Sequence, residues 1–341
     1  MTSEERNGHP LPGERRDATR QEIAAVLSEP GASFIVAAHH NADGDAIGSM
    51  LGLARALRAA GHDVVLAHPD PEPVPQDLRF MLDEDEVIVH ALPEDAEQRT
   101  FVAVDCATAN RLWYSRPPHH GVRQVLNLDH HHDNTRFGHL NLVEPTASSS
   151  AEVVAHVLEA AGWPLTKHIA EPLYVGLVTD TGRFSYANTG PEAHRVAAAL
   201  IEAGADPEEL SRQLFDELPA ERLLLLGRAM QTARLLSGGH VMAAALGPDD
   251  FAVAGGDDTE GIVEAMRSVR GVQVAALARQ VRHGAWRVSV RSDSDRVDVS
   301  AIAREEGGGG HRRAAGFTTQ RPPDDLFAWL ELQVDAQLNG G

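Results

Sequence analysis

The sequence predicts an α/β protein of two domains, and three patterns predict it. From about residue 20 to residue 190, short apolar runs alternate with segments of helical periodicity. Residues 191–236 are helical in pattern throughout, and the alternation returns from about residue 238. Continuous apolar runs are typical of strands buried on both faces of a parallel sheet. We therefore expect a Rossmann-like domain with a parallel sheet and a smaller α/β domain, joined by a helical connector.

The first domain is expected over residues 19–205, after a loose polar tail at residues 1–18. One helix begins near Ala46 and ends at Gly61, and a second begins in the serines of ASSSAEVV and ends at Gly162. The segment KHIAEPLYVGLVTDTGRF is ambiguous and can form a helix that leads into a loop. The predicted strands are FIVAAH, DVVLAH, VIVHAL, FVAVDC and QVLNLDHH.

The connector is expected over residues 206–237 and the second domain over residues 238–335. The predicted strands of the second domain are HVMAAAL, VQVAALARQV and WRVSVRS. Its predicted helices are DTEGIVEAMRSV, VDVSAIAREE and the final PDDLFAWLELQVDAQL.

Composition narrows the class of protein. The net charge of −20 argues against a protein that binds long nucleic acid through a broad basic surface. The single cysteine, Cys106, rules out a disulfide framework and fits a reducing compartment. We find no apolar run of membrane-spanning length and no hydrophobic segment of a signal peptide, so we expect a cytoplasmic protein without membrane contact.

Four apolar runs end in carboxylates or histidines, which indicates one site at the edge of one sheet. Ligands of open α/β sheets bind outside the carboxyl ends of the strands. Asp43 and Asp45 follow the first run and flank Gly44, so they could point towards neighbouring cations. The residues that end the four runs are His39, Asp105, Asp129-His130-His131 and Asp180.

Each of these residues also has an ordinary explanation. Asp43 and Asp45 can simply cap the helix that begins at Ala46, since aspartate is a preferred cap. Asp105 and Asp180 can cap loops in the same way. The Asp-His-His triplet is harder to dismiss, although His132 makes the histidine run three long and spacing alone does not assign the roles.

A second informative element is the run Gly307–Gly310 before His311. Glycines after a helix let the backbone approach a ligand closely and present N–H groups to an anion. Arg291 and Ser292 at a strand end, together with Arg312 and Arg313, make a phosphate or nucleotide site plausible. The run could instead be a flexible helix stop, and Arg312 and Arg313 could be solvated surface residues.

These motifs resemble a known family. His39 with Asp43 and Asp45, then Asp105, the DHH triplet at 129–131 and Asp180 in TDTGRF, in that order, resemble the DHH phosphoesterase superfamily. The stretch RSDSDRVDVSAIAREEGGGGHRRAAGF resembles the DHHA1 domain. Within the superfamily, the chain looks most like the NrnA-type enzymes, which are nanoRNases and pAp phosphatases, some acting on pApA or cyclic di-AMP.

The resemblance implies two divalent metal ions, usually Mn²⁺, and assigns roles by position. His39 and Asp43 would hold the first ion, and Asp45, His130 and Asp180 the second. Asp105 would bridge both ions and His131 would face the scissile phosphate, which makes these two the catalytic residues. Mixed imidazole and carboxylate ligands suit Mn²⁺ better than Mg²⁺. The substrate-binding residues implied are Arg291, Ser292, Gly309, Gly310 and His311, and Arg183 could contact phosphate.

The expected substrates are short oligoribonucleotides, pAp, and in some members pApA or cyclic di-AMP. Long duplex nucleic acid is not expected, and a homodimer is compatible with the family. Three alternatives remain open: an inorganic pyrophosphatase, a RecJ-like single-strand exonuclease, and a non-catalytic nucleotide sensor. The GGGGH block argues against the first, and the complete set of ligand positions argues against the last.

Overall fold

The computed structural model describes residues 15–71, 74–112, 121–217, 219–281 and 284–339, apart from the side chain of His311. Contacts divide the chain into two compact units, Met1–Asp216 and Glu217–Gly341. The predicted tail lies largely outside the described residues, but Arg16 and Asp17 within it form a short strand. The unit boundary falls inside the segment predicted as a connector.

The first unit is built on a seven-stranded sheet in the order β1-β7-β6-β5-β2-β3-β4. All neighbouring strands run parallel. This confirms the predicted parallel sheet. The strands are β1 (Arg16–Asp17), β2 (Ser33–Ala37), β3 (Asp63–Ala67), β4 (Ile88–Val89), β5 (Thr100–Val104), β6 (Gln124–Asp129) and β7 (Leu140–Val143).

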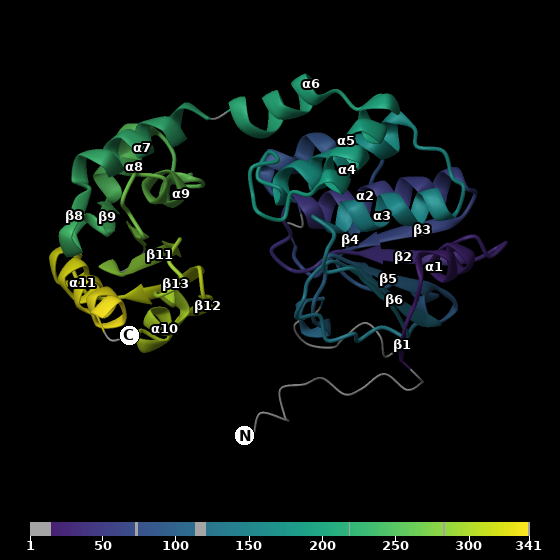
Figure 1. Ribbon diagram of the computed structural model, residues 1–341. Coiled ribbons are helices and arrows are strands. Elements are labelled where there is room, and N and C mark those ends of the chain that lie inside the picture. The colour runs from purple at the N-terminus through teal and green to yellow at the C-terminus, as the bar shows by residue number, and fades with distance from the viewer. Residues whose placement is uncertain (1–14, 72–73, 113–120, 218, 282–283, 340–341) are drawn as a thin grey trace. The chain divides into compact units, whose positions relative to one another are not determined.

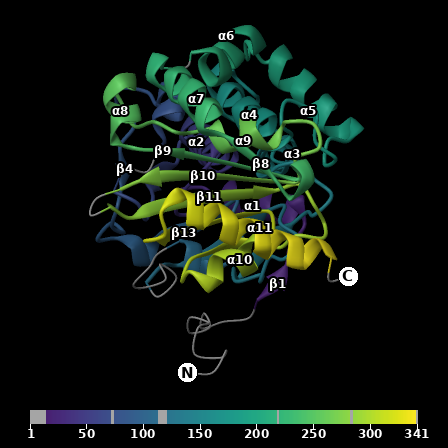
Figure 2. The same ribbon diagram turned by 90° about the vertical axis from the view of Figure 1, so that its left-hand side faces the viewer.

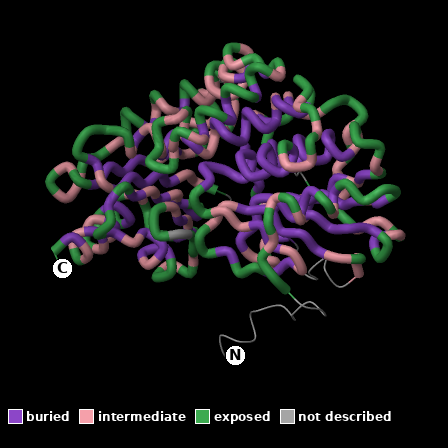
Figure 3. Tube along the Cα trace, turned by 45° about the vertical axis from the view of Figure 1, so that its right-hand side comes forward, coloured by how far each residue is buried: buried purple, intermediate pink, exposed green. Residues whose placement is uncertain are grey.

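Helices cover one face of this sheet and form the main core with it (Figure 1). Strand side chains alternate between this core and a smaller one on the other face, so β2, β5 and β6 are buried almost throughout (Figure 3). The helices of the unit are α1 (Arg20–Leu27), α2 (Gly44–Ala59), α3 (Ser150–Ala160), α4 (Lys167–Asp180), α5 (Pro191–Glu202) and α6 (Pro207–Ser211).

The strand order reverses between β2 and β5. Strands β3 and β4 lie on one side of β2, whereas β5, β6 and β7 lie on its other side. The carboxyl ends of strands at such a reversal form the usual ligand crevice of an open α/β sheet. His39 follows β2 and Asp105 follows β5, so two predicted site residues lie at this point.

Asp180 reaches the same region from a helix rather than a strand. The ambiguous segment 167–184 forms α4, and Asp180 is its last residue. Helix α4 packs tightly on α2 because glycines line the contact. A Cβ on Gly44 would lie 2.4 Å from Thr179 Oγ1, and one on Gly48 would lie 2.3 Å from the carbonyl oxygen of Pro172. The spacing GDAIGSMLG therefore fixes how close Asp180 comes to the start of α2.

The second unit contains a mixed six-stranded sheet in the order β12-β13-β11-β10-β9-β8. Only β9 and β10 pair in parallel, and the other neighbours are antiparallel. The smaller α/β domain that the sequence predicts is thereby confirmed. Its strands are β8 (Arg234–Leu236), β9 (Val241–Leu246), β10 (Val274–Gln280), β11 (Trp286–Ser292), β12 (Gly309–His311) and β13 (Ala314–Thr319).

Helices pack on both faces of this second sheet (Figure 2). Helices α10 and α11 cover one face, where Val288 and Val290 of β11 are buried. Helices α7 and α9 cover the other face over β9 and β10, where Met242 and Leu277 are buried. The helices are α7 (Ala220–Thr232), α8 (Pro248–Ala254), α9 (Ile262–Arg267), α10 (Val299–Glu305) and α11 (Pro323–Asn339).

Part of the glycine run forms a strand, which the sequence pattern does not predict. Gly309 and Gly310 belong to β12, an edge strand that pairs with β13. A Cβ on Gly308 would lie 2.3 Å from the carbonyl oxygen of Gly316, so this close approach of two backbones requires glycine. Within the described part of the chain, we find no helix both long and apolar enough to cross a bilayer.

Candidate active site

Asp45 lies at the meeting point of two helix N-termini. Its side chain is buried, and it is the second residue of α2, two positions after the N-cap Asp43. The backbone N–H groups of Ser150 and Ala151 donate to the two carboxylate oxygens of Asp45 at 2.6 and 2.9 Å. These groups belong to the first turn of α3, whose N-terminus favours negative charge. The serines of ASSSAEVV thus do more than cap their own helix: they place a carboxylate at the sheet edge.

Asp105 is buried directly after β5 in an unusual backbone conformation. Its φ is 53°, in the left-handed region that aspartate tolerates better than most residues. Its Oδ1 accepts a hydrogen bond from the hydroxyl of Ser150 at 2.9 Å. The same oxygen lies 3.6 Å from His130 Nε2, while Oδ2 lies 3.4 Å from His39 Nε2. The carboxylate of Asp105 therefore stands between two imidazoles, which follow the two strands that flank β5.

His130 brings together three carboxylates. Its Nε2 lies 3.6 Å from Asp180 Oδ2 and 3.9 Å from Asp45 Oδ2, in addition to its contact with Asp105. Asp180 arrives at the end of α4, where Asn188 Nδ2 donates to its backbone carbonyl at 3.1 Å. Two helices and two strand ends thus supply one cluster.

His131 differs from its neighbour in its contacts. Its Nδ1 lies 2.8 Å from Oδ1 of the fully buried Asp129, and Asn134 donates a hydrogen bond to Asp129 Oδ2. The hydrogen bond with Asp129 raises the pKa of His131. Burial, the largest single effect, favours the neutral form of Asp129, but the hydrogen bond and charge of His131, together with the hydrogen bond from Asn134, outweigh it and lower the pKa of Asp129. The contact between Asp129 and His131 holds the imidazole of His131 in one orientation.

His39 has a cationic neighbour that the sequence reasoning missed. A terminal nitrogen of Arg111 lies 2.9 Å from His39 Nδ1. Burial, and then the charge of Arg111, lower the pKa of His39 to about 4. A neutral imidazole is the form that binds metal. No spacing signal in the sequence connects Arg111 with His39, because they meet only through the pairing of β2 and β5.

Three groups of side chains can each hold a cation. In each group one ligand atom per residue lies within 4.8 Å of the others. The first two groups coincide with the ligand sets that the resemblance implies, and Asp105 and His130 also recur in the third. The groups are His39, Asp43 and Asp105; Asp45, His130 and Asp180; and Asp105, His130 and His131.

The carboxylates of this cluster can all stay ionised only if cations compensate their charge, and without cations some of them are protonated. Burial, followed by repulsion from neighbouring aspartates, raises the pKa of Asp45 and of Asp105 well above its usual range. Burial also raises the pKa of Asp180. Buried carboxylates this close together cannot all stay ionised without a partner of opposite charge. Their oxygen ligands and the imidazole nitrogens fit divalent transition metals such as Mn²⁺, Fe²⁺ or Zn²⁺.

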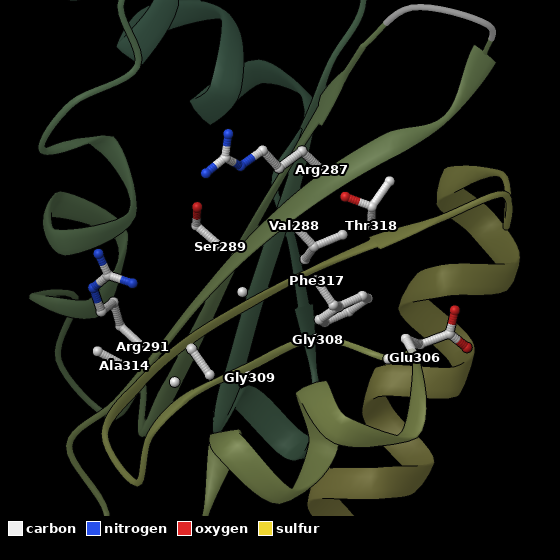
Figure 4. Close-up of a pocket in the computed structure, with 14 residues that line it drawn as sticks. Arg287, Val288, Ser289, Arg291, Glu306, Gly308, Gly309, Ala314, Phe317 and Thr318 are labelled. Atoms are coloured by element: carbon white, nitrogen blue, oxygen red, sulfur yellow. The ribbon is translucent and has the colours of Figure 1, made fainter. Parts of the chain in front are cut away.

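The second unit carries a cavity of about 710 Å³ beside the glycine run (Figure 4). Gly307–Gly310 and Arg291 line it, as the sequence predicts for a ligand site. Ser289 and Arg287 of β11 line it as well, and neither was predicted. Arg291 Nε donates to Glu264 Oε1 at 2.8 Å, so this arginine is already oriented by a carboxylate.

Other predicted substrate residues lie elsewhere. Ser292 is buried and bonded within a turn, where its hydroxyl accepts from the N–H of Ser294 at 3.1 Å. Ser292 is not among the residues that line the cavity beside Arg291. Arg183 stacks on Phe215, with its guanidinium carbon 3.7 Å from the ring centroid. The side chain of His311 lies outside the described residues.

Comparison with known proteins identifies two domains in the chain. Residues 33–177 match the DHH family, N-terminal domain, and residues 250–332 match the DHHA1 domain. The first match spans the cluster from His39 to the end of α4 except its last residues, and the second spans the glycine-lined cavity.

Individual relatives extend over most of the chain. It is 39% identical over 272 residues to the bifunctional oligoribonuclease and PAP phosphatase NrnA of Thermus thermophilus, covering 79% of each protein. A probable enzyme of the same name from Streptococcus mutans is 27% identical over 77% of this chain and 82% of its own length. The fold matches an exopolyphosphatase-related protein of Bacteroides fragilis, with a TM-score of 0.84, 21% identity, and coverage of 93% and 96%.

Proposed function

This chain belongs to the DHH–DHHA1 phosphoesterase family, in its NrnA-type group, and we propose that it hydrolyses small nucleotides with two divalent cations. Its substrates would be short oligoribonucleotides and pAp, with pApA and cyclic di-AMP as further candidates. The names of the relatives from Thermus thermophilus and Streptococcus mutans support this substrate class.

One observation carries the proposal: the position of Asp105 between two ligand groups. Its two carboxylate oxygens lie 3.4 Å from His39 Nε2 and 3.6 Å from His130 Nε2. A carboxylate that is shared in this way suits a pair of neighbouring cations. His39 and Asp43 would complete one site, and Asp45, His130 and Asp180 the other. When bound, two such cations activate a water and clamp the oxygens of the phosphate.

The protein's own groups would then orient the reaction. Asp129 holds His131 through Nδ1, so Nε2 is the atom that would face the substrate. The raised pKa of His131 favours its protonated form, which would donate a proton to a phosphoryl oxygen or to the leaving ribose oxygen. The α3 N-terminus and Ser150 would hold Asp45 and Asp105 in place as the phosphate enters.

Manganese is the ion that we propose, because imidazole nitrogens and carboxylate oxygens share the site. Mg²⁺ prefers oxygen ligands and retains water, whereas Mn²⁺ accepts mixed ligands. In the second unit, Arg291 and the backbone N–H groups of Gly309 and Gly310 would bind a substrate phosphate that is not being cleaved.

A panel assay tests this function. The full chain would be incubated with Mn²⁺ or Mg²⁺ and one of six substrates: pAp, pApA, cyclic di-AMP, a 5′-phosphorylated RNA trimer, a 24-nucleotide RNA and pyrophosphate. We expect Mn²⁺-dependent release of mononucleotide from the trimer and of phosphate from pAp. Faster cleavage of the 24-mer than of the trimer would favour a RecJ-like exonuclease instead. Cleavage of pyrophosphate alone would favour the pyrophosphatase alternative, and tight binding without turnover of any substrate would indicate a sensor.

A further inference from the structure

Two arginines face each other across neighbouring strands of the second sheet. Arg279 of β10 and Arg287 of β11 are direct partners in the antiparallel register. Side chains of such partners lie on the same face, and like charges directly opposite destabilise a sheet. Within the described residues, neither guanidinium forms an ion pair or a hydrogen bond that would offset this repulsion. Because the repulsion between Arg279 and Arg287 is not offset within the protein, the two arginines are suited to bind an anionic ligand.

Arg287 also extends the cavity that the glycine run lines. Figure 4 shows Arg287, Ser289 and Arg291 following one another on one side of β11. Their partners on β13 are Thr318, Gly316 and Ala314, which are small and leave the face open. Arg287 and Arg291 are four residues apart, or about 13 Å along a strand, so they are spaced for two different anionic groups.

Arg279 and Arg287 also line a second cavity, of about 260 Å³, together with residues of α9 and of the loop before it. Its wall carries four carboxylates. Asp258 binds Arg222 at 2.6 Å, and Glu264 binds Arg291 at 2.8 Å. Asp257 and Glu260 lie in the loop before α9, and together the four carboxylates limit how much negative charge this second cavity can accept. The open side of Arg287, over β13, is therefore the side available to an anion.

We propose that Arg287, reinforced by Arg279, binds an additional backbone phosphate of the substrate, beyond the phosphate held by Arg291 and the glycine run. This rests on the proposed function and narrows it: chains with three or more phosphates, such as a 5′-phosphorylated trinucleotide, gain an ionic contact that pAp lacks. The guanidinium of Arg287 suits this role because it donates two parallel hydrogen bonds to a phosphate. The second unit thus distinguishes short oligonucleotides from single nucleotides.

The test measures binding apart from hydrolysis. Affinity for fluorescently labelled 5′-phosphorylated RNA trimer would be measured by anisotropy with the full chain in EDTA, and pAp would be measured as a competitor. We expect Arg287→Gln to weaken trimer binding about tenfold and pAp binding much less, because a charged hydrogen bond is lost. The slope of log affinity against log salt for the trimer should become shallower by about 0.7, the value for one single-strand phosphate.

Two further variants and one stability measurement make the result decisive. Arg287→Lys keeps the charge and should restore most of the salt slope. Arg270→Gln removes an exposed arginine that lines neither cavity, and should leave trimer affinity unchanged. Because the pair repels in the free protein, Arg287→Gln should not lower the melting temperature.

Equal losses for trimer and pAp, an unchanged salt slope, or a lower melting temperature would overturn the proposal and make Arg287 structural. Failure of the proposed function shows itself differently, as absence of hydrolysis by the wild-type chain when Mn²⁺ is supplied. The binding measurement decides the role of Arg287 in either case.

Discussion

Gly48 and Pro172 approach so closely that a Cβ on Gly48 would lie 2.3 Å from the carbonyl oxygen of Pro172. The same Cβ would lie 2.9 Å from the backbone nitrogen of Gly176, so only backbone atoms form this contact and none of them can rotate away. Helices α2 and α4 carry Asp45 near the start of one and Asp180 at the end of the other. The packing of two glycine-bearing helices therefore sets the geometry of the acidic cluster.

Substituting Gly48 with alanine should push α4 away from α2 and displace Asp180. We expect a loss of about 1–3 kcal/mol in the free energy of unfolding, the usual range for overpacking. The rate should fall by more than the loss of folded protein explains, since a shift of about 1 Å in a metal-ligating side chain can lower the rate a hundredfold. Melting curves and kcat at a temperature where the variant is fully folded would check this.

Gly227→Ala in α7 is the matched control. Gly227 is exposed in a helix, and its added Cβ would meet no atom within 4 Å. Alanine there should stabilise by about 0.5–1 kcal/mol, because it restricts the unfolded chain and favours helix. If Gly48→Ala behaved like this control, the glycine contact would not set the position of α4.

Much of the fold and part of the site could be predicted from the sequence, for identifiable reasons. Buried parallel strands are continuous apolar runs, so β2, β5 and β6 were visible, and the polar residues after them marked the sheet edge. The short edge strands β1 and β12 were not visible. Two residues of a polar tail and a run of glycines carry no alternating pattern.

The rest of the site could not be predicted, because it depends on contacts between segments that are distant in the sequence. Arg111 meets His39 only because β2 and β5 are neighbours, and Ser150 meets Asp105 only because α3 begins at the sheet edge. The resemblance to the DHHA1 domain implies a substrate role for Ser292, and local pattern does not reveal that its side chain is buried and bonded within a turn. Local pattern predicts elements, but side-chain partners across 50 or so residues depend on topology.

Replacing Asp105 with asparagine should separate metal binding from stability. The pKa of Asp105 is raised by burial and then by the charge of Asp45, so a neutral side chain should relieve the metal-free protein. We expect its melting temperature in EDTA to rise by about 2–4 °C, the shift for about 1 kcal/mol at this size. Bound Mn²⁺, measured after dialysis by elemental analysis, should fall, and turnover should be lost.

Asp133→Asn is the control for this substitution, because Asp133 is exposed and belongs to none of the three cation-binding groups. It should change neither Mn²⁺ content nor melting temperature appreciably. Full metal content and normal turnover in Asp105→Asn would contradict a shared carboxylate between two cations.

Stability without metal should fall as the pH rises above about 6.5, because the effect of the raised carboxyl pKa values, which begins near pH 4, is opposed by His39 only below the ordinary pKa of histidine. Asp45 and Asp105 have raised pKa values in the folded state, so the folded protein holds protons that the unfolded chain has lost. Stability therefore decreases with pH until these groups ionise. His131, whose pKa is also raised, acts in the same direction. His39, with a pKa of about 4, is neutral in the folded state over this range, and its opposite contribution fades as the unfolded chain's histidine loses its proton just above pH 6.5.

Added Mn²⁺ should reverse this trend, because a cation replaces the retained protons. The increase in melting temperature on adding about 1 mM Mn²⁺ should grow from pH 6.5 to pH 8.5. Melting curves in EDTA and in Mn²⁺ over this range would measure both effects. A metal-induced increase that is independent of pH would show that the carboxylates are already ionised without metal.

Substituting Asp129 with asparagine should lower the pKa of His131 towards its ordinary value. The hydrogen bond from His131 Nδ1 to Asp129 Oδ1, at 2.8 Å, is the largest cause of the raised pKa, and an amide oxygen lacks the charge that favours imidazolium. A raised histidine pKa stabilises the fold fully below about pH 6.5, and this contribution is lost as the pH rises through the folded value. The loss of stability in the variant should therefore be largest below about pH 6.5, where the free energy of unfolding should fall by about 1–3 kcal/mol.

An NMR titration of His131 in the metal-free protein would measure the pKa directly, and the pH–rate profile would show its consequence. If His131 donates a proton during turnover, the basic limb of the profile should move to lower pH together with the pKa. Asp133→Asn provides the comparison here too, since Asp133 raises the pKa of His131 less than Asp129 does. A profile that stays in place while the pKa of His131 falls would mean that His131 positions the phosphate without donating a proton to it.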